Sequence, residues 1–393
     1  MKKKKKKIGK INPIIYHIGA LYCRINYFLK GIRINIDKSG VKDLKGPCLV
    51  LAPHTSGQDH ILVSLALYPH RPTYVVSEHF VLKPFIRFVM TKIAKVITKK
   101  MFCPDPSTIF GILRAKNENA VIVLFPEGRL NSAPYSHPVT SGTAELVKKM
   151  GVNVYTVTCN GATLAFPKWG EKFRKGKINI ETAKLFDGEV AKNLSVEEIS
   201  LALDKAIYHD DEKAMQGEIY KCKCTASGLE NVLYKCPECG KEFEIYTSVN
   251  EIFCNHCGFK TALGEDYKLS NGKISTVGDW FRYQTEALDL NEVLEADIKI
   301  GSADEKGNMC LEAGEGRIKA DKETFSLKGE VFGEEIEFSV NTASIGGTPY
   351  TPGSNFDIYH NKKLLYLMPN DRKTISKWVT FVDKVVAQSK SEE

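Results

Sequence analysis

Four cysteines in two closely spaced pairs constrain the fold of this chain more than any other feature. Cys236 and Cys239 are separated by two residues and are followed by a glycine, and Cys254 and Cys257 repeat the arrangement. Four thiolates at this spacing are typical of a tetrahedral zinc site, and each glycine lets the backbone turn beneath the sulfurs. Two redox dithiols are the alternative, which the doubled spacing disfavours. Because four sulfurs leave no open coordination position, we expect structural zinc and no catalytic cofactor.

The remaining cysteines fit the same interpretation. The chain has 393 residues and eleven cysteines, six of which fall between residues 222 and 257. Such clustering indicates metal binding in a reducing compartment and not a secreted disulfide framework. Cys222 and Cys224 lack the two-residue gap and are predicted to be unassigned strand residues, while His256 is predicted to be exposed and not a ligand. The length predicts two or three domains.

The charge excludes one class of partner. The formal net charge is +8, and the lysine run at residues 2–7 supplies six of the positive charges. The rest of the chain is nearly balanced, and the residues around the cysteine pairs carry more Glu than Lys. A broad basic surface is therefore not indicated, and nucleic acid is not an expected partner.

A histidine and a carboxylate lie five positions apart between two apolar runs, residues 48–52 and 61–67. The order predicts a strand, a turn that carries His54, and a helix whose first turn carries Asp59. A neutral imidazole there can take a proton from a hydroxyl, and a nearby carboxylate fixes its tautomer. Gly57 and neighbouring amides can cradle a developing oxyanion. The alternative is a capping box formed by Ser56 and Asp59, which needs no chemistry.

A second stretch also has an apolar strand that runs into a turn with charged side chains. Residues 121–125 are an apolar strand that runs into Pro126, Glu127, Gly128 and Arg129. Together the two stretches resemble the signature of the glycerolphosphate acyltransferase superfamily, whose 1-acylglycerol-3-phosphate acyltransferases carry His-x-x-x-x-Asp and Phe-Pro-Glu-Gly-Thr-Arg. The resemblance covers about the first half of the chain, and the zinc ribbon is an addition to it.

The resemblance implies a role for each matching residue. His54 would be the general base and Asp59 its orienting partner, while Glu127, Gly128 and Arg129 would bind the acceptor's glycerol and phosphate. Two departures concern the acceptor. Arg129 follows the glycine directly, where the family more often has Gly-Thr-Arg. Lys99 and Lys100 stand where the family has an arginine-bearing motif, so lysine would contact the phosphate as a point charge.

Two segments are candidates for a membrane surface. The lysine run at residues 1–10 precedes an apolar, aromatic segment at 11–30, which is too polar for a confident transmembrane helix. No signal peptide is expected, because no small-residue cleavage site follows. We predict an interfacial helix, with packing on its own domain as the alternative. Residues 84–97 also fit an amphipathic helix, for which core packing is favoured over a membrane surface or an acyl-chain groove.

The periodicity of the chain predicts an α/β fold with four parts. Helices alternate with strands around a central layered sheet, and an antiparallel region with period two closes on an amphipathic helix at 375–386. A hairpin is predicted to turn at Asn361-Lys362. The antiparallel region faintly resembles a pleckstrin-homology or GRAM-like module. The predicted parts are a basic tail and interfacial helix at 1–34, an acyltransferase domain at 35–215, a zinc-ribbon module at 216–285 and a β-rich domain with a C-terminal helix at 286–393.

The function that the resemblance implies is transfer of a fatty acyl group to a lysophospholipid hydroxyl, with 1-acylglycerol-3-phosphate foremost among the acceptors. The donor would be acyl-CoA or acyl carrier protein, and the protein would be peripheral on the cytoplasmic face of an anionic membrane. The rival interpretations are an acyltransferase for another lysolipid and a non-catalytic membrane or zinc-ribbon scaffold.

Overall fold

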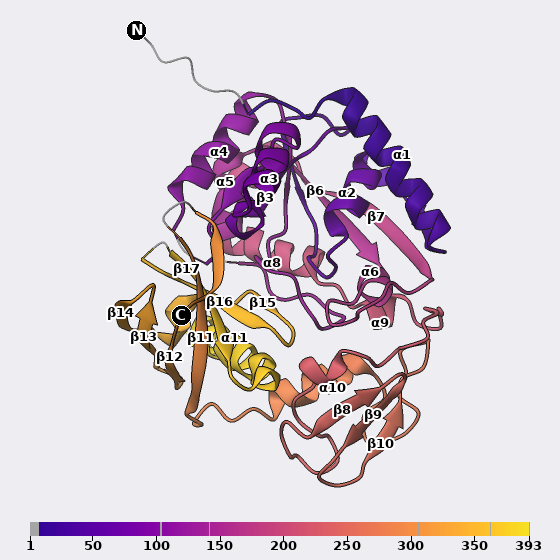
Figure 1. The fold of residues 1–393 in the computed structure, drawn as a ribbon. Helices are drawn as coiled ribbons and strands as arrows, with labels where there is room; N and C mark the ends of the chain where they lie inside the picture. Colours follow the sequence, from indigo (N-terminus) through magenta and orange to yellow (C-terminus); the bar gives the residue numbers. More distant parts are fainter. Residues whose placement is uncertain (1–7, 103, 141, 305–306, 362, 393) are drawn as a thin grey trace. The chain divides into compact units, whose positions relative to one another are not determined.

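A computed structural model describes residues 8–102, 104–140, 142–304, 307–361 and 363–392 (Figure 1). The described chain divides into two compact units. The first contains the residues up to Lys100 together with Asp105–Lys168 and Phe173–Lys221. The second contains Met101–Pro104, Trp169–Lys172 and the residues from Cys222 onward. The predicted basic run at residues 2–7 lies outside the described residues.

The first unit is built on a seven-stranded sheet with the order β1-β7-β6-β2-β5-β3-β4. Neighbouring strands are parallel except for the antiparallel pair β6 and β7. Every residue of β2 and β5 is buried, as expected for central strands of a parallel sheet that is covered on both faces. The strands are β1 Arg33–Ile36, β2 Cys48–Leu51, β3 Thr73–Ser77, β4 Ile97–Lys99, β5 Val121–Leu124, β6 Asn153–Asn160 and β7 Lys177–Phe186.

Helices flank this sheet, so the predicted layered α/β architecture is confirmed (Figure 1). Buried residues of α4, α5 and α8 form one core with Leu49 and Leu51 of β2. The cap of α8 is the predicted Ser195, which forms a capping box with Glu198. The helices are α1 Pro13–Leu29, α2 Asp59–Leu67, α3 Pro84–Phe88, α4 Pro106–Asn117, α5 Gly142–Met150, α6 Ala162–Ala165, α7 Gly188–Asn193, α8 Val196–Ile207 and α9 Asp211–Ala214.

The prediction of one amphipathic helix over residues 84–97 is wrong. Helix α3 passes into a π-helix at Val89–Ile93, and the chain then forms β4, which pairs with β3. Lys95 has a φ of 59°, a left-handed conformation that ends the helix. The favoured core packing holds for Ile97, which is buried in the core at the start of β4. It does not hold for α3 or the π-helix, neither of which contains a buried residue.

Helix α1 confirms the predicted helix at residues 11–30. One side of it contacts α2, where Tyr16 Oη donates to the Ser64 carbonyl and Tyr27 Oη donates to Gln58 Oε1. The opposite side leaves several large apolar side chains exposed. None of the helices in the described part of the chain combines the length and apolar character needed to cross a bilayer.

The second unit contains a small sheet and a large one. The small sheet has the order β10-β9-β8 and is followed by α10 Val277–Glu286. Its strands are β8 Ile245–Ser248, β9 Glu251–Cys254 and β10 Lys260–Ala262. Cys222 and Cys224 belong to no strand, which corrects the prediction. The chain bends at these residues. The Cys224 N–H donates to Cys222 Sγ over 3.4 Å, and not to a backbone carbonyl of a neighbouring strand.

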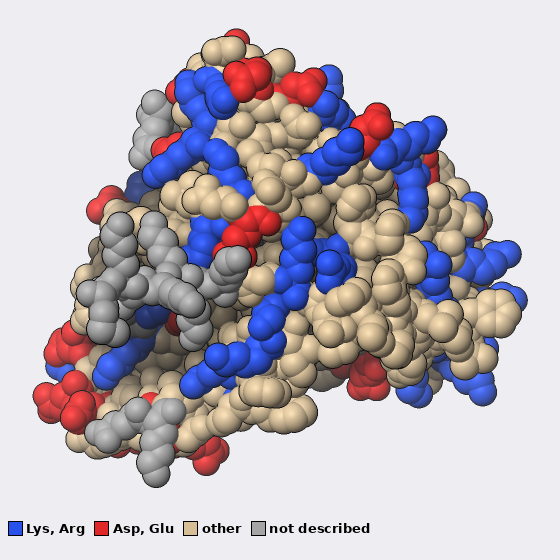
Figure 2. All heavy atoms as spheres, turned by 90° about the horizontal axis from the view of Figure 1, so that it is seen from above, with Lys and Arg blue, Asp and Glu red and all other residues tan. Residues whose placement is uncertain are grey.

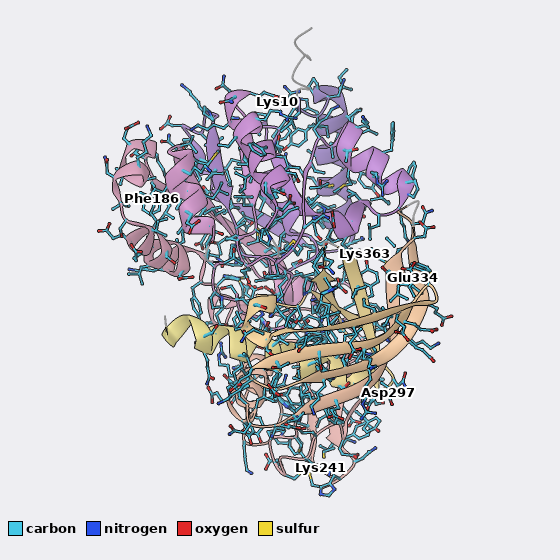
Figure 3. All side chains as sticks on the ribbon, turned by 90° about the vertical axis from the view of Figure 1, so that its left-hand side faces the viewer. Lys10, Phe186, Lys241, Asp297, Glu334 and Lys363 are labelled. Atoms are coloured by element: carbon cyan, nitrogen blue, oxygen red, sulfur yellow. The ribbon has the colours of Figure 1, made fainter. Side chains whose placement is uncertain are left out.

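The large sheet is antiparallel, as predicted, with the order β14-β13-β12-β11-β17-β16-β15. Figure 3 shows its long strands, with Asp297 on β11 and Glu334 at the start of β14. The predicted face of the terminal helix is buried, and Trp378 stacks on Phe356 at a ring distance of 5.9 Å. The elements are β11 Leu294–Ala303, β12 Met309–Ala320, β13 Thr324–Val331, β14 Glu334–Asn341, β15 Tyr350–Thr351, β16 Asn355–His360, β17 Lys363–Pro369 and α11 Ile375–Glu392.

The predicted hairpin is present, because β16 pairs with β17. Asn361 has a φ of 47°, which is common at a tight turn, and Lys362 lies outside the described residues. Both the ribbon and the β-rich region fall in the second unit. The finer division into four parts, and the likeness to a pleckstrin-homology or GRAM-like module, stay predictions.

Candidate active site

His54 and Asp59 meet at the carboxyl edge of the first sheet. β2 ends at Leu51, and Asp59 is the first residue of α2. His54 Nδ1 lies 3.0 Å from Asp59 Oδ2. The carboxylate is buried, while 23% of the histidine side chain is exposed. A buried carboxylate at Nδ1 holds the proton on that nitrogen and leaves Nε2 as the basic position.

The Asp59 carboxylate also forms one of the two hydrogen bonds of the alternative capping box. Asp59 Oδ2 also accepts the backbone N–H of Ser56 over 2.9 Å, as one arm of a capping box requires. The other arm is absent, because Ser56 Oγ accepts from Gln58 N and not from Asp59 N. Asp59 therefore caps the turn and contacts the imidazole with one oxygen, and the two interpretations are compatible.

The backbone of His54 is held on both sides. Its N–H donates to Glu127 Oε1 over 2.6 Å, and its carbonyl accepts from Asn131 N over 3.0 Å. The imidazole stacks on Phe125, with ring centroids 4.4 Å apart and planes at 21°. In the part of the chain that the structure describes, Nε2 has no hydrogen-bond partner. The ring is thus fixed in orientation, with one nitrogen left for chemistry.

Glu127 follows β5 and joins two loops. Its Oε2 accepts the backbone N–H of His137 over 2.7 Å, so each carboxylate oxygen binds one backbone donor. The residue is 3% exposed. Burial raises the pKa of Glu127 to about 7, although both backbone donors favour its charged form. The structure gives this residue a positioning task, and its predicted contact with the acceptor stays a prediction.

Arg129 lies close to the same loops. Gly128 has a φ of 79°, which sets the turn, and Arg129 Nη2 lies 3.0 Å from His137 Nε2. Burial, together with the charges of Arg129 and Lys168, holds the pKa of His137 well below its usual value. A neutral His137 accepts this hydrogen bond and orients the guanidinium of Arg129, a residue that is 7% exposed.

Comparison with known proteins agrees with the motifs. Residues 33–160, about a third of the chain, match the family model described as Acyltransferase. The resemblance to acyltransferases is confirmed. Among solved structures, the chain is similar to the 1-acyl-sn-glycerophosphate (LPA) acyltransferase PlsC from Thermotoga maritima, with 13% sequence identity and a TM-score of 0.42. That similarity covers 51% of this chain and 78% of the PlsC chain.

Lys99 and Lys100 stand apart from the acyltransferase motifs. They follow one another at the end of β4, the edge strand, with β3 between β4 and β5. Two strand spacings separate β4 from β5 by about 10 Å. Lys100 Nζ lies 3.9 Å from Glu78 Oε1. Both lysines share the carboxyl edge of the sheet with His54 and Glu127, and their role in phosphate binding stays a prediction.

Several residues of the site were missed in the sequence. Asn131 and His137 lie in a polar loop without periodicity, and His209 and Asp211 lie at the start of α9. For Asn131 and His137, the signal that the sequence offered was that their loop lies close to Glu127 along the chain. His209 and Asp211 are far from both motifs in sequence and gave no signal.

The four predicted cysteine ligands converge in the second unit, where their sulfurs lie within 4.8 Å of one another. Cys236 Sγ is 3.9 Å from Cys257 Sγ, and Cys239 Sγ is 3.9 Å from Cys254 Sγ. Zinc–sulfur bonds of about 2.3 Å in a tetrahedron place the sulfurs about 3.8 Å apart, so the cluster fits zinc.

The backbone supports the same conclusion. Gly240 and Gly258 each have a φ of 73°, and their N–H groups donate to the carbonyls of Cys236 and Cys254. The two turns are therefore equivalent knuckles with glycine where the left-handed conformation requires it. His256 is exposed and is not part of the cluster, as expected.

Proposed function

We propose that the protein transfers a fatty acyl group from a thioester donor to the hydroxyl of a lysophospholipid, foremost 1-acylglycerol-3-phosphate. The observation that carries the proposal is the His54–Asp59 pair, which lies at the carboxyl edge of an α/β sheet inside the matched acyltransferase segment. Sites in such sheets lie at the carboxyl ends of the strands. Acyl-CoA and acyl carrier protein are the proposed donors.

The proposed chemistry needs one base and no covalent enzyme intermediate, because a thioester is already activated. His54 Nε2 accepts the proton as the acceptor's oxygen attacks the thioester carbonyl carbon. The carbon–sulfur bond then breaks, and the leaving thiolate takes the proton back from the imidazolium. Asp59 holds the Nδ1 proton and stabilises the charged ring between these steps.

The turn leaves space for the reacting carbonyl. A Cβ built on Gly57 meets no atom within 4 Å, so substrate can approach this backbone closely. An N–H group there can stabilise the oxyanion of the tetrahedral intermediate. Arg129, Lys99 and Lys100 supply the positive charge that an acceptor phosphate requires, with Arg129 oriented by His137.

The proposed location is peripheral attachment to the cytoplasmic face of an anionic membrane. Helix α1 supports it, because its outer side exposes a continuous set of large apolar residues. A helix that exposes an apolar face to solvent and carries basic side chains beside it is typical of membrane interfaces. Figure 2 shows Lys and Arg interspersed with uncharged surface. The exposed residues are Ile14, Ile15, Ile18, Leu21, Tyr22, Ile25, Phe28 and Leu29.

A panel of acceptors tests the function. Purified protein is incubated with labelled acyl-CoA or acyl carrier protein and vesicles that carry lysophosphatidic acid, lysophosphatidylcholine, lysophosphatidylethanolamine or no lysolipid. We expect a diacyl product that is largest with lysophosphatidic acid. A preference for another lysolipid would replace the proposed acceptor. Absence of transfer to every acceptor would favour the scaffold interpretation.

A further inference from the structure

The first unit contains a second, fully enclosed histidine–carboxylate pair. His209 Nε2 lies 2.6 Å from Asp211 Oδ1, and the two side chains are 4% and 0% exposed. Burial opposes a charge on the imidazole, but the carboxylate outweighs it and the pKa of His209 is raised. Because both side chains are almost completely buried, this pair is not placed to contact substrate.

The carboxylate of Asp211 supports the His54 turn through one chain of hydrogen bonds. Its Oδ1 accepts the N–H of Gly161 over 2.5 Å, and its Oδ2 accepts the N–H of Thr163 over 2.7 Å. These residues form the tight connection from β6 into α6, where Gly161 has a φ of 89°. The Thr163 hydroxyl then donates to the carbonyl of Thr55 over 3.3 Å. Thr55 directly follows His54, so the carboxylate is connected to the turn through one residue.

The backbone of His209 supports the same turn through a second chain of hydrogen bonds. Its backbone N–H donates to Ser136 Oγ over 2.8 Å, and its carbonyl accepts from Ser136 N over 2.9 Å. Ser136 precedes His137, whose N–H donates to Glu127 Oε2. Glu127 Oε1 in turn accepts the His54 N–H. One chain of hydrogen bonds therefore starts from the Asp211 carboxylate and the other from the backbone of His209, whose ring binds that carboxylate, and both end at the His54 turn.

We propose that His209 and Asp211 are positioning residues that hold the His54 turn in the geometry needed for proton transfer. This inference rests on the proposed acyl transfer. Outer-shell partners of this kind orient the groups that react, and small misplacements of a catalytic group are costly. A positioning role predicts a fall in kcat with little change in KM, because both chains of hydrogen bonds end on the His54 turn, while Arg129 contacts the ring of His137, which is part of neither chain.

Variants at the pair separate positioning from simple support of the fold. Asp211→Asn removes one of two acceptor oxygens, since an amide nitrogen cannot accept an N–H. His209→Ala removes the partner of Asp211, whereas His209→Gln keeps a donor for Asp211 Oδ1. The matched control is Thr182→Val, which removes a buried hydroxyl that donates to the Asp37 carbonyl over 2.9 Å, in a different part of the same unit.

The experiment measures kcat, KM and urea stability for the wild type and all four variants in the full chain. We expect Asp211→Asn and His209→Ala to lower kcat about tenfold to a hundredfold with KM within about twofold. His209→Gln should keep most of the wild-type kcat that His209→Ala loses. Thr182→Val should keep the wild-type kcat although it loses about as much stability as the variants of the pair. Equal effects on kcat for control and pair variants at equal stability would overturn the proposal.

A second readout is independent of the reaction. In protein labelled with ¹⁵N-histidine, the ring nitrogens of His54 report its tautomer and its contact with Asp59. We expect these signals to shift in His209→Ala and Asp211→Asn, and to stay in place in His209→Gln and Thr182→Val. If the wild type transfers no acyl group, the proposed function fails while this readout still decides the positioning role. Unshifted His54 signals in the pair variants would overturn it.

Discussion

The backbone N–H of His54 donates to Glu127 Oε1 over 2.6 Å. The two motifs that identified the acyltransferase segment are therefore joined by a hydrogen bond from the backbone of one to a side chain of the other. Glu127 is 3% exposed, and its second oxygen accepts from His137. A carboxylate that binds two backbone donors sets the position of the His54 turn before any substrate arrives.

Glu127 predicts a pH dependence of stability. Its pKa is raised from 4.5 to about 7 in the folded protein. Between these values the folded state holds a proton that the unfolded state has lost, so stability falls as pH rises. The contribution amounts to about 3 kcal/mol, and the decline ends above the folded-state pKa.

The measurement compares urea unfolding of the wild type and Glu127→Gln from pH 4.5 to pH 8. The stability of the wild type relative to Glu127→Gln should decrease from pH 4.5 to about pH 7 and level off above it. Glu181→Gln, a change at an exposed carboxylate of the same unit, is the control and should show no such trend. A wild-type advantage that grows with pH would contradict the assigned shift.

The cysteine cluster predicts one tightly bound zinc per chain. Cys236→Ser and Cys254→Ser should lose the metal and the structure of the small sheet, because each removes a ligand whose sulfur is buried within the cluster. Cys222→Ser, a half-buried cysteine outside the cluster, is the matched control. Elemental analysis of freshly purified, reduced protein gives the zinc content, and a metal-free wild type would refute the assignment.

Loss of zinc should also affect the terminal helix. Lys377 on α11 is 4% exposed and lies 2.6 Å from Glu242 of the ribbon and 2.7 Å from Glu292. Breaking a buried ion pair leaves an uncompensated charge. We therefore expect chelation to lower the stability of the β-rich region as well. Some acyl transfer should remain, because the proposed chemistry lies in the first unit.

The exposed side of α1 predicts two kinds of vesicle binding. Replacing Ile18, Leu21 and Phe28 by serine should abolish the component that only detergent releases, because these side chains are 60–77% exposed and are the proposed inserting groups. Deleting residues 1–10 should remove the salt-sensitive component. Leu201→Ser, at a position of 73% exposure on α8, should change neither. Sedimentation with anionic and neutral vesicles measures both, and an unchanged triple variant would exclude α1 as the anchor.

Sequence reasoning succeeded where signals are local. The apolar runs before His54 and Glu127 predicted β2 and β5, and the cysteine spacing predicted the metal cluster. It failed where tertiary contacts decide. β4 forms because it pairs with β3, which overrides the helical pattern of residues 84–97. His209 and Asp211 act through residues as far as 73 positions away, and one sequence contains no trace of that pairing.

Turnover of variants at His54 and Asp59 tests whether these two residues perform acyl transfer. Initial rates are measured for wild type, His54→Ala and Asp59→Asn with the best thioester and lysolipid of the panel, after circular dichroism has shown that the variants are folded. We predict a loss of turnover of about 10²- to 10⁴-fold for each variant, the range for general acid–base catalysis. A folded variant that keeps wild-type turnover would contradict the claim and leave Asp59 with only its capping role.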